Sequence, residues 1–399
     1  MRKLNHLFVT QDFGPDRGGM ARRHVELCRR FGDAANSMAV STVRLDGAAD
    51  FDAAEKYHIY RQPFHFREAN RFANQVRWAR WLMKSGKGSA DVFHLGNIRP
   101  VGYAVWWAHS RLRVPYMLYV NGGDLLREQR KTARGGMKRR TARRIIGEAT
   151  GIVATSSWVA DLTRDVLDQI EVKTPPPVAA LDLGTDPAVF SPSRDKGLLR
   201  VKWKVGESPL LLTVARLVPH KGQDNVIRSL ALLSEELPEL RYVLVGEGHD
   251  ETRLRALAAE LGVSERVIFA GALSDDELPE AYATSNIYVG ASRLDNTVNV
   301  EGFGISFLEA SASGLPVVAG DSGGVRSAVR DGLTGIVVPP EDVRKISSAI
   351  RDLLRDPARA ESFGSAGRLA VETHFNWDRV AADTREFTLS VVSRKTARS

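Results

Sequence analysis

Two glutamates within one apolar stretch are the first residues whose types and spacing could do chemistry. Glu301 and Glu309 lie eight positions apart in "EGFGISFLE", and the glycine-rich "GDSGG" follows further along the chain. Two carboxylates can serve as the acid and base of a hydrolase, or they can bind opposite ends of one long polar ligand. The spacing and the neighbouring residues bear on this choice.

The spacing disfavours a hydrolytic pair without excluding it. Eight helical steps would separate the carboxylates by ~12 Å along the axis, whereas glycosidase pairs need about 5–9.5 Å. We expect Glu301 to end a loop, which shortens the gap, and Glu309 to lie more than one turn into the helix that follows. The first N–H groups of that helix, those of Phe303, Gly304 and Ile305, would form an anion site. The segment could therefore bind a phosphate in its middle and hydroxyl groups at both ends. A nucleotide sugar has these groups in this order.

Two cations follow the first strand of the second half. In "VARLVPHKGQD", Arg216 stands at a strand end and Lys221 just before a helix. Arg and Lys at close range suit a diphosphate. Solvated loop charges are the alternative, which the mostly apolar strand before Arg216 disfavours.

Two pairs of glycines each follow a predicted strand, one pair in each half of the chain. Gly18 and Gly19 should open a helix after the first strand, where backbone N–H groups can approach an anion; a tight turn without a ligand is the alternative. Gly246-x-Gly248 also follows a strand but lacks the third glycine of the dinucleotide fingerprint. We interpret it as a turn beside the ligand.

Alternating strands and helices must position these residues. The first half has β-rich runs at 6–10, 38–43, 91–96, 115–122 and 151–156, with helical patterns at 19–31 and 138–148. The second half has such runs at 210–216, 241–248, 267–273, 286–292, 316–320 and 334–340, with helices expected at 223–235, 250–261, 275–284, 303–313 and 343–354. This order predicts an α/β fold of two Rossmann-like, doubly wound domains facing a cleft, with ligands at the strand ends.

Composition and charge agree with two domains. The chain has 399 residues, and the polar, turn-rich stretch at 190–204 is the expected join. Residues 1–200 carry 33 − 20 = +13 charges and residues 201–399 carry 23 − 28 = −5. The single Cys28 allows no internal disulfide, which fits a reducing cytosol. We see neither a signal peptide nor a window of ~20 apolar residues.

The chain resembles a known family at these motifs. "EGFGISFLE" matches the E-x7-E motif of the retaining family-4 (group 1) glycosyltransferases, which have the GT-B fold, and "VARLVPHKG" matches their phosphate-binding segment. "LVGEG", "EASASGLPVVAGDSGG" and "DGLTGIVVPPED" look like their second domain in order and spacing. The likeness is specific over about 205–345 and looser over 1–190. The stretch around Glu301 is also similar to bacterial mannosyltransferases that act on phosphatidylinositol mannosides.

The resemblance implies domains at 1–190 for the acceptor and 191–375 for the nucleotide sugar, with a C-terminal helix at 376–399 crossing back. It also implies a role for each site residue. Arg216 and Lys221 would hold the diphosphate, Glu301 the sugar hydroxyls and Glu309 the ribose. Backbone groups of 303–305 would touch sugar and phosphate, while Gly18, Gly19 and Gly246 would line the donor site.

One departure from the family concerns the sugar-facing histidine. Many relatives have a His-Gly pattern after the fourth strand of the first domain, where this chain has Asn121 in "YVNGGD". A side-chain contact to the sugar is therefore in doubt, although a contact from the Asn121 backbone carbonyl needs no imidazole. His94 is the other candidate to face the sugar, against a structural role.

The implied reaction is transfer of a hexosyl unit from GDP-mannose or a UDP-sugar to a hydroxyl of a glycan, glycolipid or lipid-linked acceptor. The family retains the anomeric configuration, which a front-face attack explains, and the sequence offers no obvious nucleophile. We expect no cofactor and no metal site, since no D-x-D motif is apparent and two cations can act on the diphosphate. The alternatives are a phosphorylase or epimerase on the same fold, or a silent nucleotide-sugar binder.

A basic segment in the first half indicates a further partner. Residues 127–144 hold nine basic residues and one acid, and 71–84 mixes Arg with Phe and two Trp. The segment from Arg127 to Arg144 is a candidate for docking on an anionic membrane; a solvated helix face with core tryptophans is the alternative. We expect no nucleic-acid partner, since no recognition motif appears. The expected location is cytoplasmic, or peripheral on the inner face of the membrane.

Overall fold

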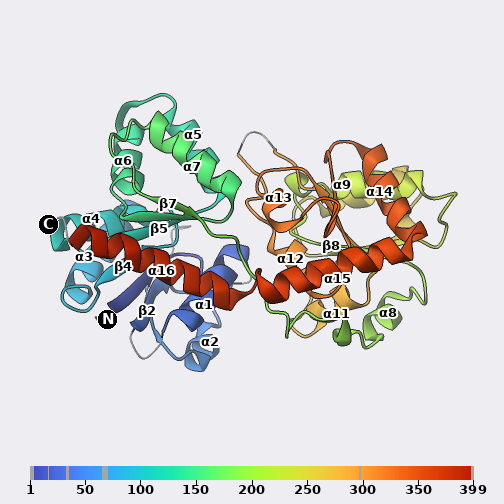
Figure 1. The fold of residues 1–399 in the computed structure, drawn as a ribbon, viewed down its shortest axis with the longest axis horizontal. Coiled ribbons are helices and arrows are strands. Elements are labelled where there is room, and N and C mark those ends of the chain that lie inside the picture. Colours follow the sequence, from blue (N-terminus) through green and yellow to red (C-terminus); the bar gives the residue numbers. More distant parts are fainter. Residues whose placement is uncertain (1–3, 17, 33–35, 65–70, 296–297, 397–399) are drawn as a thin grey trace. The chain divides into compact units, whose positions relative to one another are not determined.

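The computed structural model describes residues 4–16, 18–32, 36–64, 71–295 and 298–396. The chain forms two compact units, each with its own parallel sheet (Figure 1). Unit 1 consists of Met1–Leu181 and Trp377–Ser399, and unit 2 of Asp182–Asn376.

Unit 1 contains a seven-stranded sheet in the order β3-β2-β1-β4-β5-β6-β7. Every strand pair in it is parallel. The strands are β1 (Leu4–Val9), β2 (Asn36–Val43), β3 (His58–Gln62), β4 (Val92–Leu95), β5 (Tyr116–Val120), β6 (Gly151–Ala154) and β7 (Val178–Ala180). The helices are α1 (Gly19–Phe31), α2 (Ala48–Ala54), α3 (Arg71–Ser85), α4 (Gly102–Leu112), α5 (Gly122–Thr132), α6 (Gly136–Gly147), α7 (Ser157–Gln169) and α16 (Trp377–Thr396).

The sequence of the central strands explains this architecture. Strands β4, β5 and β6 are buried at every position, as expected for strands of a parallel sheet that is covered on both faces. A large apolar cluster around Trp78, Tyr116 and Ile145 fills one side of the sheet. Trp78 belongs to this core and donates to Oγ of Ser41 at 2.8 Å, so the core interpretation of this tryptophan is correct.

Unit 2 contains a six-stranded parallel sheet in the order β10-β9-β8-β11-β12-β13. The strands are β8 (Leu210–Val214), β9 (Arg241–Val245), β10 (Val267–Gly271), β11 (Ile287–Gly290), β12 (Val317–Gly320) and β13 (Gly335–Val338). The α-helices are α8 (Leu198–Trp203), α9 (Gln223–Leu232), α10 (Glu251–Glu260), α11 (Glu277–Ala283), α12 (Ile305–Ala312), α13 (Val325–Ala328), α14 (Val343–Arg355) and α15 (Pro357–Thr373). Short 3₁₀ helices are η1 (Pro192–Arg194), η2 (Pro219–Lys221) and η3 (Ser264–Arg266).

Both sheets have a topological switch point, where the strand order reverses direction. It lies between β1 and β4 in unit 1 and between β8 and β11 in unit 2. Ligands of open α/β sheets bind outside the carboxyl ends of the strands at such a point. Arg216, predicted at a strand end, and Glu301, predicted in the loop after a strand, follow the two strands that flank the switch point of unit 2.

The boundary between the units differs from the predicted join near residues 190–204. The chain leaves unit 1 after Leu181, because the segment that follows already belongs to unit 2. There, the N–H of Thr185 donates to the carbonyl of Phe375 at 2.9 Å. The C-terminal helix α16 belongs to unit 1, where it packs on α1.

Two strands of unit 1 were not predicted, and both lie at the edges of the sheet. Strand β3 alternates exposed and half-buried residues up to the buried Gln62, and β7 has only three residues, none of them buried. Neither has the continuous apolar run that marks a central strand. The other eleven strands overlap the predicted runs.

Candidate active site

The site is built around an ion pair at the switch point of unit 2. Nζ of Lys221 lies 2.6 Å from Oε2 of Glu301, and the side chains are 19% and 15% exposed. Lys221 ends η2, which follows β8, and Glu301 lies in the loop after β11. The structure therefore brings together two of the three predicted catalytic residues, both of them part-buried.

The carboxyl group of Glu301 is held in its ionised form. Burial alone would raise its pKa, but the charge and hydrogen bond of Lys221, the neighbouring His220 and the N–H of Phe303 together lower the pKa below its usual value. A carboxylate in this state accepts hydrogen bonds and cannot serve as a proton donor at neutral pH. This property suits binding of sugar hydroxyls better than general acid catalysis.

Arg216, the third predicted catalytic residue, lies two positions after the end of β8, and its side chain is exposed. Its guanidinium has no hydrogen-bond or ion-pair partner within the described parts of the chain. Its backbone is fixed, because Nε2 of Gln223 donates to the Arg216 carbonyl at 3.0 Å. A positioned backbone that carries an unpaired cation is ready to receive an anion.

His220 was not predicted, yet it lies among these groups. Burial, reinforced by the positive charges of Lys221 and Arg216, lowers the pKa of His220 to about 4, while Glu301 and Asp295 oppose the shift. The imidazole is therefore neutral at neutral pH. The only sequence signal was its position beside Lys221, since a single loop histidine has no distinctive pattern.

The start of α12 differs in part from the prediction. The N–H of Phe303 helps to lower the pKa of the Glu301 carboxylate, so this N–H is directed at Glu301. Gly304 has φ +96°, and Ile305 begins the helix. A Cβ on Gly304 would lie 2.4 Å from the Phe307 ring, which explains the glycine. The N–H groups of Gly304 and Ile305 stand where a helix leaves its first donors without intrahelical partners.

Glu309 is buried in α12, with 4% exposure. The hydroxyl of Tyr282 on α11 donates to its Oε2 at 2.6 Å. The two glutamates of the E-x7-E pattern thus have different surroundings, one beside a lysine and one beside a tyrosine. Tyr282 was missed, because nothing in "PEAYATS" distinguishes it from a core aromatic residue.

Gly246 has a packing role that the sequence did not reveal. It has φ +128°, and a Cβ would lie 2.2 Å from the Ala215 carbonyl oxygen. Gly248 is equally close to the neighbouring backbone, with its Cβ position 2.0 Å from the carbonyl oxygen of Leu217. The two glycines let the loop after β9 lie directly against the loop that carries Arg216.

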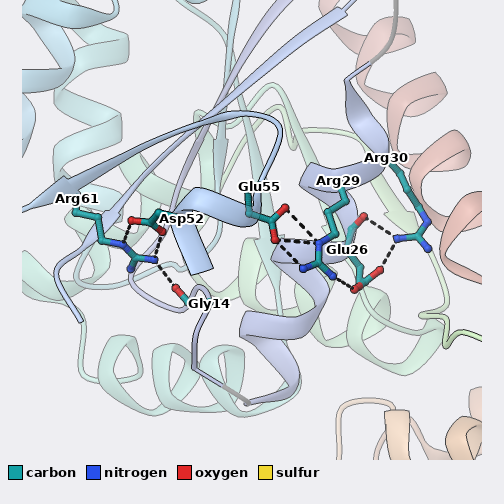
Figure 2. Close-up of polar contacts among 7 residues, drawn as sticks. All are labelled: Gly14, Glu26, Arg29, Arg30, Asp52, Glu55 and Arg61. Carbon is teal, nitrogen blue, oxygen red and sulfur yellow. Dashed lines mark hydrogen bonds and ion pairs between the residues drawn. The ribbon is translucent and has the colours of Figure 1, made fainter. Parts of the chain in front are cut away.

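In unit 1, Gly18 and Gly19 open α1 as predicted from the turn pattern. The N–H of Gly18 donates to Oδ1 of Asp16 at 3.1 Å. Arg61 on β3 fixes the preceding loop, since its Nη2 donates to the Gly14 carbonyl at 2.6 Å and to Oδ1 of Asp52 at 2.7 Å (Figure 2).

Ion pairs of Arg29 and Arg30 stabilise the position of helix α1. Arg29 contacts Glu55 at 2.6 Å and Glu26 at 3.0 Å, and Arg30 also contacts Glu26 (Figure 2). Arg30 reaches Asp378 on α16 at 2.6 Å as well. These contacts fix the helix that begins with the glycine pair.

The two residues of unit 1 that were candidates to face the sugar, Asn121 and His94, differ in burial. Asn121 precedes α5 and is half-buried, with Nδ2 2.8 Å from Sδ of Met20, and its carbonyl accepts from the N–H of Leu125 at 3.2 Å. The proposal that His94 faces the sugar is wrong. His94 is fully buried on β4, and its ring nitrogens contact His6 at 2.9 Å and Tyr119 at 2.8 Å.

Family models match both units of the chain. The model of the glycosyl transferases group 1 matches residues 195–370, and that of glycosyltransferase family 4 matches residues 17–173. Together they cover the candidate site of unit 2 and the glycine turn of unit 1.

Curated relatives match over nearly their whole length. A GDP-mannose-dependent alpha-(1-6)-phosphatidylinositol monomannoside mannosyltransferase of Mycolicibacterium smegmatis is 38% identical, over 93% of this chain and 94% of that protein. The protein of the same name from Mycobacterium tuberculosis is 31% identical, over 96% of this chain and 97% of that protein.

Solved structures show the same fold at low sequence identity. Anabaena Alr3699/HepE in complex with UDP and glucose superposes with a TM-score of 0.78 at 20% identity, over 97% of this chain and 99% of that one. Sucrose-phosphate synthase from Thermosynechococcus elongatus gives 0.80 at 20% identity, over 98% and 100%. From its motifs, its two parallel-sheet units and these relatives, the chain belongs to the group 1, family 4 glycosyltransferases and has the GT-B fold.

Proposed function

We propose that this glycosyltransferase moves a mannosyl unit from GDP-mannose to a hydroxyl of a lipid-linked acceptor, with retention of configuration and without a metal ion. The observation that carries the proposal is the Lys221–Glu301 pair at the switch point, with His220 next to it under the positive charge of Arg216. The choice of mannose and of a glycolipid acceptor rests on the two mycobacterial relatives, which are named for that donor and for phosphatidylinositol monomannoside.

Each group has a defined task in this reaction. The bond between the anomeric carbon and the β-phosphate oxygen breaks, and GDP leaves with the bonding electrons. Arg216 and Lys221 stabilise the charge that develops on the phosphate, the contribution that is usually largest in such reactions. Glu301 accepts hydrogen bonds from the sugar hydroxyls. The acceptor hydroxyl attacks the anomeric carbon from the same face, and its proton passes to the departing phosphate oxygen.

The surroundings of the two glutamates support a front-face route. Glu301 is paired with Lys221, and Glu309 is buried and bonded by Tyr282. A double-displacement route needs a carboxylate that can reach the anomeric carbon as a nucleophile. Neither environment favours that role.

Metal independence is supported by the two cations of the site. Arg216 is exposed and unpaired within the described chain, and Lys221 can exchange Glu301 for a phosphate oxygen. Two positive charges beside the diphosphate supply the electrostatic stabilisation that a divalent cation gives elsewhere. We expect full turnover in excess EDTA; a loss that Mg²⁺ or Mn²⁺ reverses would contradict this part.

Docking on an anionic membrane is supported by the surface of α5 and α6 in unit 1. Arg130, Arg134, Lys138 and Arg140 are exposed and have no ion-pair partner within the described chain. Met137 among them is 81% exposed. An exposed apolar side chain on a segment with several unpaired cations suits a lipid–water interface, where each charge contributes about 1 kcal/mol. None of the described helices meets the length and hydropathy of a membrane-spanning segment.

Vesicle flotation tests the docking surface. The protein should float with anionic vesicles and not with neutral ones. The Arg134→Glu/Lys138→Glu/Arg140→Glu variant should lose this binding while keeping donor affinity, because none of these residues belongs to the donor site. Equal flotation of the variant would reject the surface.

A donor panel tests the reaction itself. GDP-mannose, UDP-glucose and ADP-glucose are each offered with a phosphatidylinositol mannoside acceptor, and nucleotide release is measured. We expect release from GDP-mannose that depends on the acceptor, together with an α-linked product shown by NMR. Release from UDP-glucose alone would overturn the donor, and a β-linked product would overturn retention.

A further inference from the structure

A second ion pair joins the two loops that carry Lys221 and Glu301. Nη1 and Nη2 of Arg293 contact Oδ1 and Oδ2 of Asp224, each at 3.0 Å. Asp224 lies in the first turn of α9, and Arg293 follows β11. The pair is therefore bidentate and fixes an orientation as well as a distance.

Backbone contacts join the same two loops. The N–H of Arg293 donates to the carbonyl of His220 at 2.8 Å. Gly222 packs so closely on the β11 exit that a Cβ there would lie 1.9 Å from the Ala291 carbonyl oxygen. The segment from His220 to Asp224 is thus held against residues 291–293 at three successive points.

The ion pair extends to a third loop. Arg253 on α10 contacts Asp224 at 3.5 Å and binds Asp250 with both Nε and Nη2 at 2.7 Å. The N–H of Asp250 donates to the carbonyl of Leu217 at 3.1 Å. Asp224 therefore lies between two guanidiniums and links the loops that follow β8, β9 and β11.

We propose that Asp224 and Arg293 are positioning residues for the donor diphosphate. Both carboxylate oxygens of Asp224 bind Arg293, whose charge is thereby neutralised and not offered to the donor. The pair acts through the two loops: it holds Lys221 at the distance from Glu301 at which one ligand can contact both. This inference rests on the proposed function, because it assumes that Lys221 binds the diphosphate.

The site tolerates little displacement of Lys221. Lys221 has a flexible stem, so its useful position depends on where η2 places its backbone. Misplacement of a catalytic group by about 1 Å can cost ~100-fold in rate. A bidentate pair between the two loops removes that freedom, whereas backbone contacts alone leave the loops able to shift.

The test is a double-mutant cycle on GDP affinity, measured by isothermal titration calorimetry. We expect Asp224→Asn to weaken GDP binding about tenfold or more, and Lys221→Met to weaken it as well. In the Lys221→Met background, Asp224→Asn should cost less than about threefold, because Asp224 acts through Lys221. The same factor in both backgrounds would overturn the positioning role.

Two further variants separate positioning from loss of folding. Arg293→Gln removes the same pair from its more exposed partner, so it should reproduce the Asp224→Asn effect, and the two together should cost no more than either alone. Arg355→Gln is the matched control, since it breaks an ion pair with Glu236 elsewhere in unit 2 and should leave GDP affinity unchanged. Thermal unfolding is followed for each variant.

Failure of the inference and failure of the proposed function give different results. If folded Lys221→Met binds GDP like the wild type, the diphosphate site itself is wrong, and the inference falls with it. If Lys221→Met is impaired while folded Asp224→Asn and Arg293→Gln bind within twofold of the wild type, only the positioning role is wrong.

Discussion

Nζ of Lys221 lies 2.6 Å from Oε2 of Glu301, across 80 positions of the chain. One residue ends η2 after the first strand of unit 2, and the other lies in the loop after the fourth. In the proposed function the donor would lie at this contact, with a phosphate in place of the carboxylate beside Lys221 and a sugar hydroxyl in place of the ammonium beside Glu301.

Removing either cation should slow the reaction strongly. Loss of one contact to a developing negative charge typically costs ~2.7–4 kcal/mol of activation free energy. We therefore expect Arg216→Ala and Lys221→Ala each to reduce turnover of GDP-mannose by about 100-fold or more. Turnover within tenfold of the wild type would remove the residue from the catalytic set.

Glu301 should stabilise unit 2 in a pH-dependent way. Its pKa in the folded state lies below the usual 4.5, so the ionised carboxylate stabilises the fold above pH 4.5, and this stabilisation is lost as the pH falls through the folded-state pKa. Glu301→Gln should thus lower the free energy of unfolding more at pH 7 than at pH 3, measured in urea.

Glu239→Gln is the control for that measurement. It removes a carboxylate that is 72% exposed and 3.6 Å from Arg241. Its effect should be small at both pH values. A Glu301→Gln effect that is the same at pH 7 and pH 3 would show that the charge of Glu301 is not involved.

His220 should respond to the donor through its protonation. Its pKa of about 4, against an ordinary 6.5, means that the unfolded chain binds the proton more readily, so His220 makes the fold less stable as the pH falls from 6.5 towards 4. His220→Gln should lose that part of the pH dependence.

In an NMR titration, GDP should raise the pKa of the His220 imidazole, because the diphosphate favours the charged form. An unchanged midpoint would place His220 away from the donor.

A methyl group on Gly222 should disturb the site. Gly222 has φ +72°, and its Cβ position is 1.9 Å from the Ala291 carbonyl oxygen, so Gly222→Ala must push apart the loops after β8 and β11. We expect weaker GDP binding and a lower melting temperature. Gly206→Ala is the matched control, since Gly206 has φ +52° with open space around it. Equal effects on GDP binding would show that backbone strain alone is responsible.

The sequence was sufficient to predict the residues at strand ends. A mostly apolar strand followed by Arg216, and a long loop that contains Glu301, can be recognised locally, and the parallel order of the strands places both at one edge of the sheet. The alternation of strands and helices likewise predicted both sheets, apart from the edge strands β3 and β7, which lack a buried run.

Contacts between distant loops could not be predicted in this way. The bidentate pair of Asp224 and Arg293 joins positions whose types are ordinary for exposed loops and helix starts. His94 shows the opposite failure: a histidine near a strand end appeared functional, yet β4 is buried at every position and its partners are His6 and Tyr119. Which side chains meet depends on packing that no local pattern records.

A crystal structure with GDP-mannose bound tests the central claim most directly. We predict that diphosphate oxygens lie within ~2.7–3.2 Å of Nζ of Lys221 and of the Arg216 guanidinium, and that the Glu301 carboxylate contacts the mannose hydroxyls. A diphosphate that neither cation touches, or a mannose turned away from Glu301, would contradict the account.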